Sequence, residues 1–193
     1  MSKLYVYAGI AASVVMIAIG IGSIVVGTAG RSEVRDKIEV EQITGTPDMN
    51  PEDTRTAIEE AGIEAEAPDC TVAGEPVDDG DSAKCFAEYM RIHALEDTGG
   101  LTYAEMPRFI GEDGEPTAEE SDAAVDPKSG EPVSNPMRNI WVTETALATA
   151  LNTSYFAEQV AMFSIVMGIC LLLAGIGFLV LTLRLPWRQE GRS

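Results

Sequence analysis

Two uncharged apolar runs near opposite ends of the chain constrain its fold more than any other feature. Leu4–Gly27 and Val160–Leu183 each contain 24 residues without Asp, Glu, Lys or Arg. At a rise of about 1.5 Å per residue, each run makes a helix of about 36 Å, and the hydrocarbon core of a bilayer is about 30 Å thick. The sequence therefore predicts two membrane-spanning helices.

The distribution of charge predicts the orientation of the two spans. Residues 28–157 include 29 acidic and nine basic residues, whereas the terminal sides of the spans carry Lys3, Arg184, Arg188 and Arg192. Basic flanks tend to stay in the cytoplasm, and long acidic segments are translocated with little regard to charge. We therefore expect a multi-pass protein of the cell (plasma) membrane, with both termini cytoplasmic and the central segment exoplasmic. The basic residues just after the first span, Arg31, Arg35 and Lys37, do not fit this rule.

A cleavable signal peptide is the alternative interpretation of the first apolar run. Small residues at Gly27–Ala29 would suit a cleavage site. The apolar region of a signal peptide is usually about 7–15 residues long, and this run is much longer. The length favours a membrane span.

The cysteines agree with the predicted orientation. Cys70 and Cys85 both lie in the acidic segment, and Cys170 lies in the second span. In an oxidising exoplasmic compartment, a Cys70–Cys85 disulfide would close a short loop and contribute about 3 kcal/mol in the chain-entropy model. The alternatives are two free thiols or a cytosolic central segment.

Helix signals outside the apolar runs predict four further stretches of helix. We expect the first span to continue to about Ile43, a short helix over Pro51–Ala65, and a third helix over Ser82–Asp97 that ends at two glycines. The last helix should start at Ile140 and run without a break to Leu183.

The acidic segment is poor in large apolar residues. Only 21 of its 130 residues are Leu, Ile, Val or Phe, and residues 111–136 are rich in Gly, Pro and acids, which predicts a mobile loop. The predicted fold is an all-α membrane protein with two long antiparallel helices. Each helix spans the membrane and extends beyond it, and a small helical cap closed by the disulfide connects them. The predicted order is a first span (1–27), an exoplasmic acidic segment (28–157), a second span (158–185) and a cytoplasmic tail (186–193).

Two blocks of sequence resemble a known family. HALEDTGGLTYAEM at His93–Met106, together with the pattern of Asn152–Gly168, is similar to a family of uncharacterised two-span envelope proteins of actinobacteria and related bacteria. The resemblance implies this architecture and a place in the membrane. Some members are labelled aromatic-ring-opening dioxygenases. Such enzymes generally use two His and a carboxylate on one iron, and this chain has a single His.

The same block contains the candidate sensing residues of the cap, His93 and Tyr103. The only histidine could respond to pH, or its ring could simply pack against the cap and bond to a carbonyl group.

Acidic clusters at Asp78–Asp81 and Glu112–Glu115 would suit calcium, but neither matches the EF-hand pattern, and such loops are usually just solvated. We predict no metal site and no cofactor.

Small residues four positions apart in the spans predict close helix packing. The candidate packing residues are Gly9, Ser13, Ala18, Gly22, Gly27, Cys170 and Ala174. The spacing leaves open whether they join the two helices of one chain or different subunits. Cys170 would pack there as a small apolar side chain.

The sequence contains no P-loop, dinucleotide fingerprint, zinc spacing or nucleophile elbow, and its acidic segment argues against binding nucleic acid. The predicted function is therefore non-enzymatic. We expect a structural or accessory subunit of an envelope complex, or a homo-oligomer, whose partners are the lipid bilayer and other protein subunits. The alternative is an exoplasmic module that senses a ligand or cation and is coupled to the two membrane helices.

Overall fold

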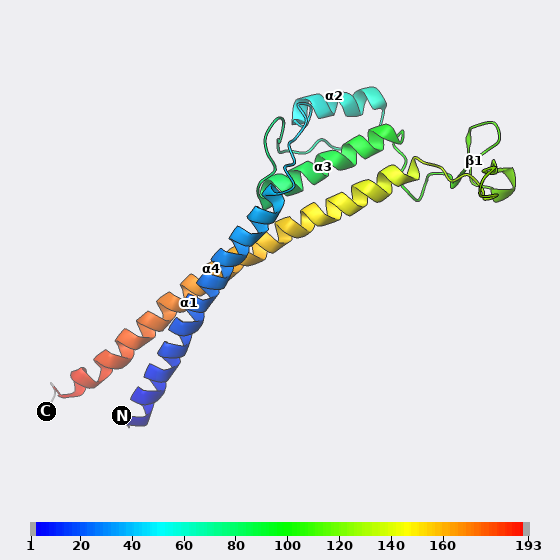
Figure 1. The fold of residues 1–193 in the computed structure, drawn as a ribbon. Helices are drawn as coiled ribbons and strands as arrows, with labels where there is room; N and C mark the ends of the chain where they lie inside the picture. Colours follow the sequence, from blue (N-terminus) through cyan, green and yellow to red (C-terminus); the bar gives the residue numbers. More distant parts are fainter. Residues whose placement is uncertain (1–2, 191–193) are drawn as a thin grey trace. The chain divides into compact units, whose positions relative to one another are not determined.

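A computed structural model describes the backbone of residues 3–190 and the side chains of residues 4–184. It divides into two compact units (Figure 1). The helix pair consists of α1 (Lys3–Glu39) up to Lys37 and α4 (Arg138–Glu190) from Phe156 onwards. The acidic unit comprises residues 38–155. The flanking Arg188 and Arg192, on which the predicted orientation partly depends, lie outside the described side chains.

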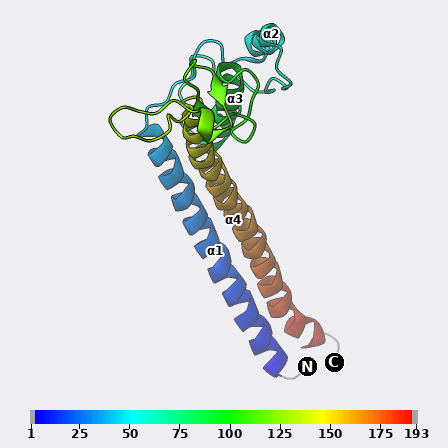
Figure 2. The same ribbon diagram turned by 90° about the vertical axis from the view of Figure 1, so that its right-hand side faces the viewer.

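Within the helix pair, α1 and α4 pack against each other along their apolar runs. The start of α1 and the end of α4 lie at the same end of the pair, so the helices are antiparallel (Figures 1 and 2). Both are long and apolar enough to cross a membrane by length and composition. Only 11% of the most apolar window of α1 and 17% of that of α4 are buried. Most of the apolar surface of the pair therefore faces outwards, as Val26 (70% exposed) and Phe163 (64%) illustrate.

Small residues at seven-residue intervals bring the two helices close together. The buried positions are Ser13, Gly20 and Gly27 on α1, and Ala161, Gly168, Gly175 and Thr182 on α4. A Cβ atom added to Gly27 would lie 2.7 Å from the carbonyl oxygen of Ala161, and one added to Gly175 would lie 3.1 Å from that of Ser13. A repeat of seven is typical of helices that stay in contact through left-handed packing.

A buried carboxylate holds the helix pair together beyond its apolar stretch. Arg31 and Arg35 of α1 donate from their Nε atoms to Oε1 of Glu158 on α4, at 2.7 and 2.8 Å. The side chain of Glu158 is 7% exposed and those of the two arginines are 37% and 40% exposed. These contacts give a structural role to Arg31 and Arg35, two basic residues that do not fit the predicted orientation of the spans.

In the acidic unit, α2 (Pro51–Ala61) and α3 (Gly80–Asp97) start with side-chain caps. The carboxamide oxygen of Asn50 accepts from the backbone N–H groups of Glu52 and Asp53. Glycine at 62, with φ 64°, ends α2 four residues earlier than the sequence predicts. The third helix begins two residues before its predicted start because Asp79 caps it.

A disulfide and a buried tyrosine connect α3 to the preceding loop. Cys70 and Cys85 are bonded, as the sequence predicts, with their Cα atoms 6.0 Å apart. Tyr89 on α3 is fully buried, and its hydroxyl donates to the carbonyl oxygen of Cys70. Met49 and Val72 complete this small core.

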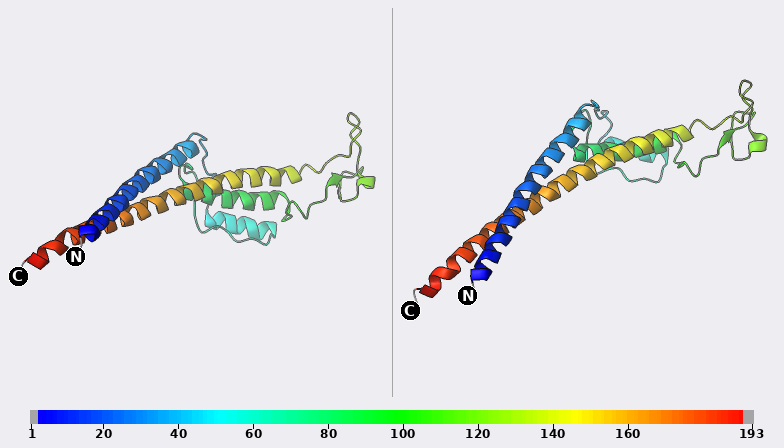
Figure 3. Two further views of the ribbon diagram at one scale, coloured as in Figure 1. Left: turned by 90° about the horizontal axis from the view of Figure 1, so that it is seen from below. Right: turned by 60° about the horizontal axis from the view of Figure 1, so that its bottom comes forward.

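A second core lies between α2, α3 and the first turns of α4. Its buried apolar side chains are Ile58, Ile63, Ile92, Ala94, Leu95, Met106 and Trp141. Trp141 donates from Nε1 to the carbonyl oxygen of Leu101 at 2.8 Å, which fixes the chain after α3 against α4. The views in Figure 3 show α2, α3 and this part of α4 side by side.

The region of the predicted mobile loop 111–136 has more local order than the sequence indicates. Strands β1 (Phe109–Ile110) and β2 (Pro116–Thr117) pair antiparallel, and a short 3-10 helix, η1, covers Glu120–Asp122. Two turns at Gly114 and Gly130 have positive φ angles and allow the chain to reverse twice. Over residues 3–190 the fold is therefore mainly helical, with a small β-hairpin that we did not predict.

Candidate functional site

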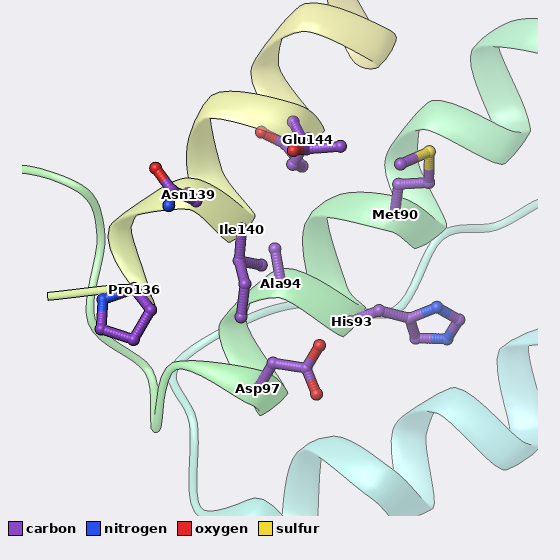
Figure 4. A pocket seen from close by; sticks show the side chains of 9 residues that line it. Met90, His93, Ala94, Asp97, Pro136, Asn139, Ile140 and Glu144 are labelled. Atoms are coloured by element: carbon purple, nitrogen blue, oxygen red, sulfur yellow. The ribbon is translucent and has the colours of Figure 1, made fainter.

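A pocket of about 410 Å³ lies between α3 and the beginning of α4, inside the acidic unit (Figure 4). Both helices contribute side chains to its walls. Its lining consists of Met90, His93, Ala94, Asp97, Pro136, Asn139, Ile140, Thr143 and Glu144. Apolar walls with a few polar groups are typical of sites for small ligands.

A buried carboxylate gives this pocket its chemical character. Glu144 of α4 is 6% exposed and accepts a hydrogen bond from the hydroxyl of Thr145 at 3.1 Å. Among the described ion pairs none involves Glu144 or Asp97, the second carboxylate of the pocket. Burying a carboxylate without a cation is costly, so a positively charged ligand would be favoured here.

The predicted sensing residue His93 lies at the edge of the pocket, where its ring points away from α4 (Figure 4). Nε2 of His93 lies 3.1 Å from Oδ2 of Asp48, in the loop before α2. A hydrogen bond from the hydroxyl of Thr46, with a smaller contribution from His93, lowers the pKa of Asp48. His93 therefore connects α3 to the neighbouring loop through a carboxylate, and not through the backbone carbonyl group of the structural alternative.

The other predicted sensing residue, Tyr103, lies in a different place. Its ring is stacked under the guanidinium of Arg138, 3.8 Å from the ring centroid, and a hydrogen bond from Arg138 lowers the pKa of the phenol. Tyr103 lines a second pocket and does not line the one that contains His93. The structure does not bring the two predicted sensing residues together.

The predicted packing residues divide into two groups. Gly9, Ser13 and Gly27 lie in the contact between α1 and α4: a Cβ atom on Gly9 would come within 2.7 Å of the Thr182 hydroxyl. The other predicted packing residues are exposed in the chain: Ala18, Gly22, Cys170 and Ala174. Nothing lies within 4 Å of a Cβ atom added to Gly22. These four leave the question of contacts between subunits open.

The acidic clusters do not assemble a recognisable metal centre. Among the described side chains, those of residues 4–184, no group of three or more His, Cys, Asp or Glu is arranged to hold a metal ion. The cluster Glu112–Glu115 lines an exposed hollow beside β2, where the Asp113 carboxylate accepts from the backbone N–H of Glu115 at 3.0 Å. In the cluster Asp78–Asp81, Asp79 serves as the cap of α3.

Sequence reasoning missed Glu144 and Glu158, the two buried carboxylates of α4. A signal for both was present, since each is an isolated acid in a long stretch of otherwise uncharged residues. An acid at such a position requires a partner or a special environment. For Glu158 the partners are Arg31 and Arg35; for Glu144 the environment is the pocket.

No protein-family model matches this chain, and no curated protein or solved structure shows significant similarity to it. The candidate site is therefore assessed on its own geometry.

Proposed function

We propose that this protein is anchored in the cell membrane by the helix pair and acts there as a non-enzymatic subunit of an assembly. The observation that carries the proposal is the exposure of the apolar runs of α1 and α4. Only 11% of the most apolar window of α1 and 17% of that of α4 are buried, so most of their apolar surface faces outwards. Core helices of a soluble protein would be mostly buried. A surface of this size in water would cause aggregation, whereas lipid or other subunits would cover it.

The ion cluster at Glu158 supports a membrane boundary near this level of the pair. Charged groups are costly in the hydrocarbon region, so Arg31, Arg35 and Glu158 would lie at or outside its edge. Over the apolar runs themselves, the helices approach through small residues, as is typical of membrane helices. We further propose that both termini are cytoplasmic and that the acidic unit is exoplasmic, where the Cys70–Cys85 disulfide would be stable.

Assembly is the role that the remaining features favour. The exposed small residues on the helix pair would allow close approach of another membrane helix, from a second copy or a partner subunit. This arrangement fits the two-span envelope family that the sequence resembles.

Co-expression of two differently tagged copies, followed by purification on one tag in mild detergent, tests the assembly role. Recovery of the second tag supports a homo-oligomer, and recovery of one stoichiometric partner supports an accessory subunit. A monodisperse monomer without the second tag or a partner contradicts the proposal. Alkaline extraction provides the matched test of anchoring, because an integral protein stays in the membrane pellet.

A second candidate function, sensing of a cation by the acidic unit, is favoured by Glu144. This buried carboxylate lines the pocket of about 410 Å³ and has no described ion pair. It lies on α4, the same continuous helix that carries the second apolar run. A bound cation would therefore act on an element that continues into the membrane.

Thermal unfolding with putrescine or calcium as the added cation tests the sensing role. The expected result is a rise in Tm that Glu144→Gln abolishes and that Glu96→Gln, on α3 outside the pocket lining, leaves in place. An unchanged Tm with both cations, or an equal response in both variants, contradicts it.

A further inference from the structure

The second pocket of the acidic unit differs from the first in charge. It has a volume of about 470 Å³ and lies at the start of α4. Its lining is Tyr103, Arg108, Phe109, Ser134, Asn135, Arg138, Asn139 and Val142, which includes two guanidinium groups and no carboxylate. The acidic unit has 27 acidic residues and only six basic ones, so the meeting of two arginines here is not a consequence of overall composition.

Neither arginine is neutralised by the protein. None of the ion pairs among the described side chains involves Arg108 or Arg138. Arg138 donates from Nη1 to the carbonyl oxygen of Met106 at 2.8 Å, stacks on Tyr103 and donates a hydrogen bond to its phenol. A guanidinium has five N–H groups, so others remain available for a ligand. Two positive charges therefore face one pocket without a counter-charge.

A buried asparagine holds the two arginine-bearing segments in place. Asn135 is 3% exposed, and its backbone N–H donates to the carbonyl oxygen of Arg108 at 2.9 Å. Its side chain donates to the carbonyl oxygen of Pro107 at 3.0 Å and accepts from the N–H of Met137 at 3.0 Å. Through these contacts Asn135 connects Met137, the neighbour of Arg138, to Arg108. The pocket is therefore formed before a ligand arrives.

We infer that this pocket binds a phosphate monoester through Arg108 and Arg138. Planar guanidinium groups match the oxygens of a phosphate in pairs, and two of them balance a group whose charge is about −1.5 to −2 at neutral pH. Ser134 and Asn139, which also line the pocket, would supply neutral hydrogen bonds. The volume is in the range of about 300–1,000 Å³ that is usual for small-molecule sites. The inference is independent of the assembly and cation proposals.

Phosphorus NMR of the full-length protein in maltoside micelles tests this inference, because the detergent contains no phosphate. The two probes are glycerol phosphate, which is free in water, and dihexanoyl phosphatidic acid, a soluble lipid with the same group. Saturable binding of either probe at constant ionic strength supports the site. The probe that binds more tightly shows whether the ligand is a soluble phosphate ester or a lipid headgroup.

The variant Arg108→Gln should weaken binding by about 10- to 100-fold, the usual effect of removing a charge-assisted contact. The guanidinium of Arg108 forms no described hydrogen bond or ion pair within the chain, so the substitution should preserve the fold. Arg91→Gln is the matched control, since Arg91 stacks on Trp141, 5.1 Å from the ring centroid, outside this pocket. No saturable binding by the wild type, or equal weakening in the two variants, would overturn the inference.

Discussion

Gly20 and Gly168 face each other so closely that neither could carry a side chain. A Cβ atom on Gly20 would lie 2.8 Å from the carbonyl oxygen of Gly168, and one on Gly168 would lie 2.7 Å from that of Gly20. Real Cβ contacts essentially never reach such distances, and the atoms in the way belong to rigid backbone. This pair therefore sets the separation of α1 and α4 at the middle of their contact.

Gly168→Leu should separate the two helices and destabilise the helix pair by about 1–3 kcal/mol, as overpacking of a close contact does. Gly177→Leu is the matched control on the same helix, because nothing lies within 4 Å of a Cβ atom there. Thermal unfolding in detergent, followed by circular dichroism, compares the two variants. Equal changes in Tm would show that the close contact has no special role.

Glu158→Gln should weaken the same helix pair by a different mechanism. It removes the charge that Arg31 and Arg35 share, at a side chain that is 7% exposed, and we expect a loss of about 1–3 kcal/mol. The control is Glu33→Gln, which breaks the exposed Glu33–Lys37 pair and should cost at most about 0.5 kcal/mol. Chemical unfolding of both variants in detergent measures the difference. A loss as small as that of the control would contradict the structural role of the cluster.

The helices could be predicted because apolar run length and helix-end residues are local signals in the sequence. The disulfide was predicted from the compartment expected for the acidic segment. The small residues that meet were predicted only in part: Gly9, Ser13 and Gly27 lie in the contact, and the other four candidates do not. A four-residue spacing directed attention to Ala18 and Gly22, whereas the contact uses the seven-residue series that contains Gly20 and Gly168. A single helix cannot reveal its partner's register, so both spacings were compatible with the sequence.

The pockets were less predictable because they join residues far apart in the chain. Glu144 and Ala94 line one pocket only because the second core packs α3 against α4. Arg108 and Arg138 line the other because Asn135 connects their segments. Neither long-range contact leaves a periodic signal in the sequence.

Tyr89→Phe should destabilise the acidic unit by about 1–3 kcal/mol, because the partly buried carbonyl group of Cys70 would lose its donor. Tyr155→Phe is the matched control: among the described contacts, its ring lies under the amino group of Lys84, and its hydroxyl forms no hydrogen bond. Near-ultraviolet circular dichroism during urea unfolding measures both variants. Tyr89→Phe with the stability of the control would contradict the assigned bond.

Acid should destabilise the acidic unit below about pH 4. Hydrogen bonds from Thr102 lower the pKa of Glu105, and backbone N–H groups of Lys128 and Ser129 lower that of Asp126. A lowered pKa in the folded state means that the stabilisation is complete above the unfolded value, 4.5 for Glu105 and 3.8 for Asp126, and is lost as the pH falls through the folded value.

Glu105→Gln checks this pH dependence, since the amide oxygen can still accept from Thr102 but does not titrate. The variant should lose less stability than the wild type when the pH is lowered through this range. Thermal unfolding at a series of pH values gives the comparison. Identical slopes would show that Glu105 makes no contribution to the acid response.

The orientation of the chain across the membrane is the central claim, and labelling of introduced cysteines tests it most directly. In a Cys170→Ser background, Ser121→Cys in the acidic unit and Ser193→Cys at the C-terminus are treated in intact cells with a maleimide that cannot cross membranes. The account predicts that the cysteine at 121 reacts at once and that the cysteine at 193 reacts only after the cells are opened. Labelling of 193 in intact cells together with protection of 121, or recovery of the chain in the soluble fraction, would contradict it.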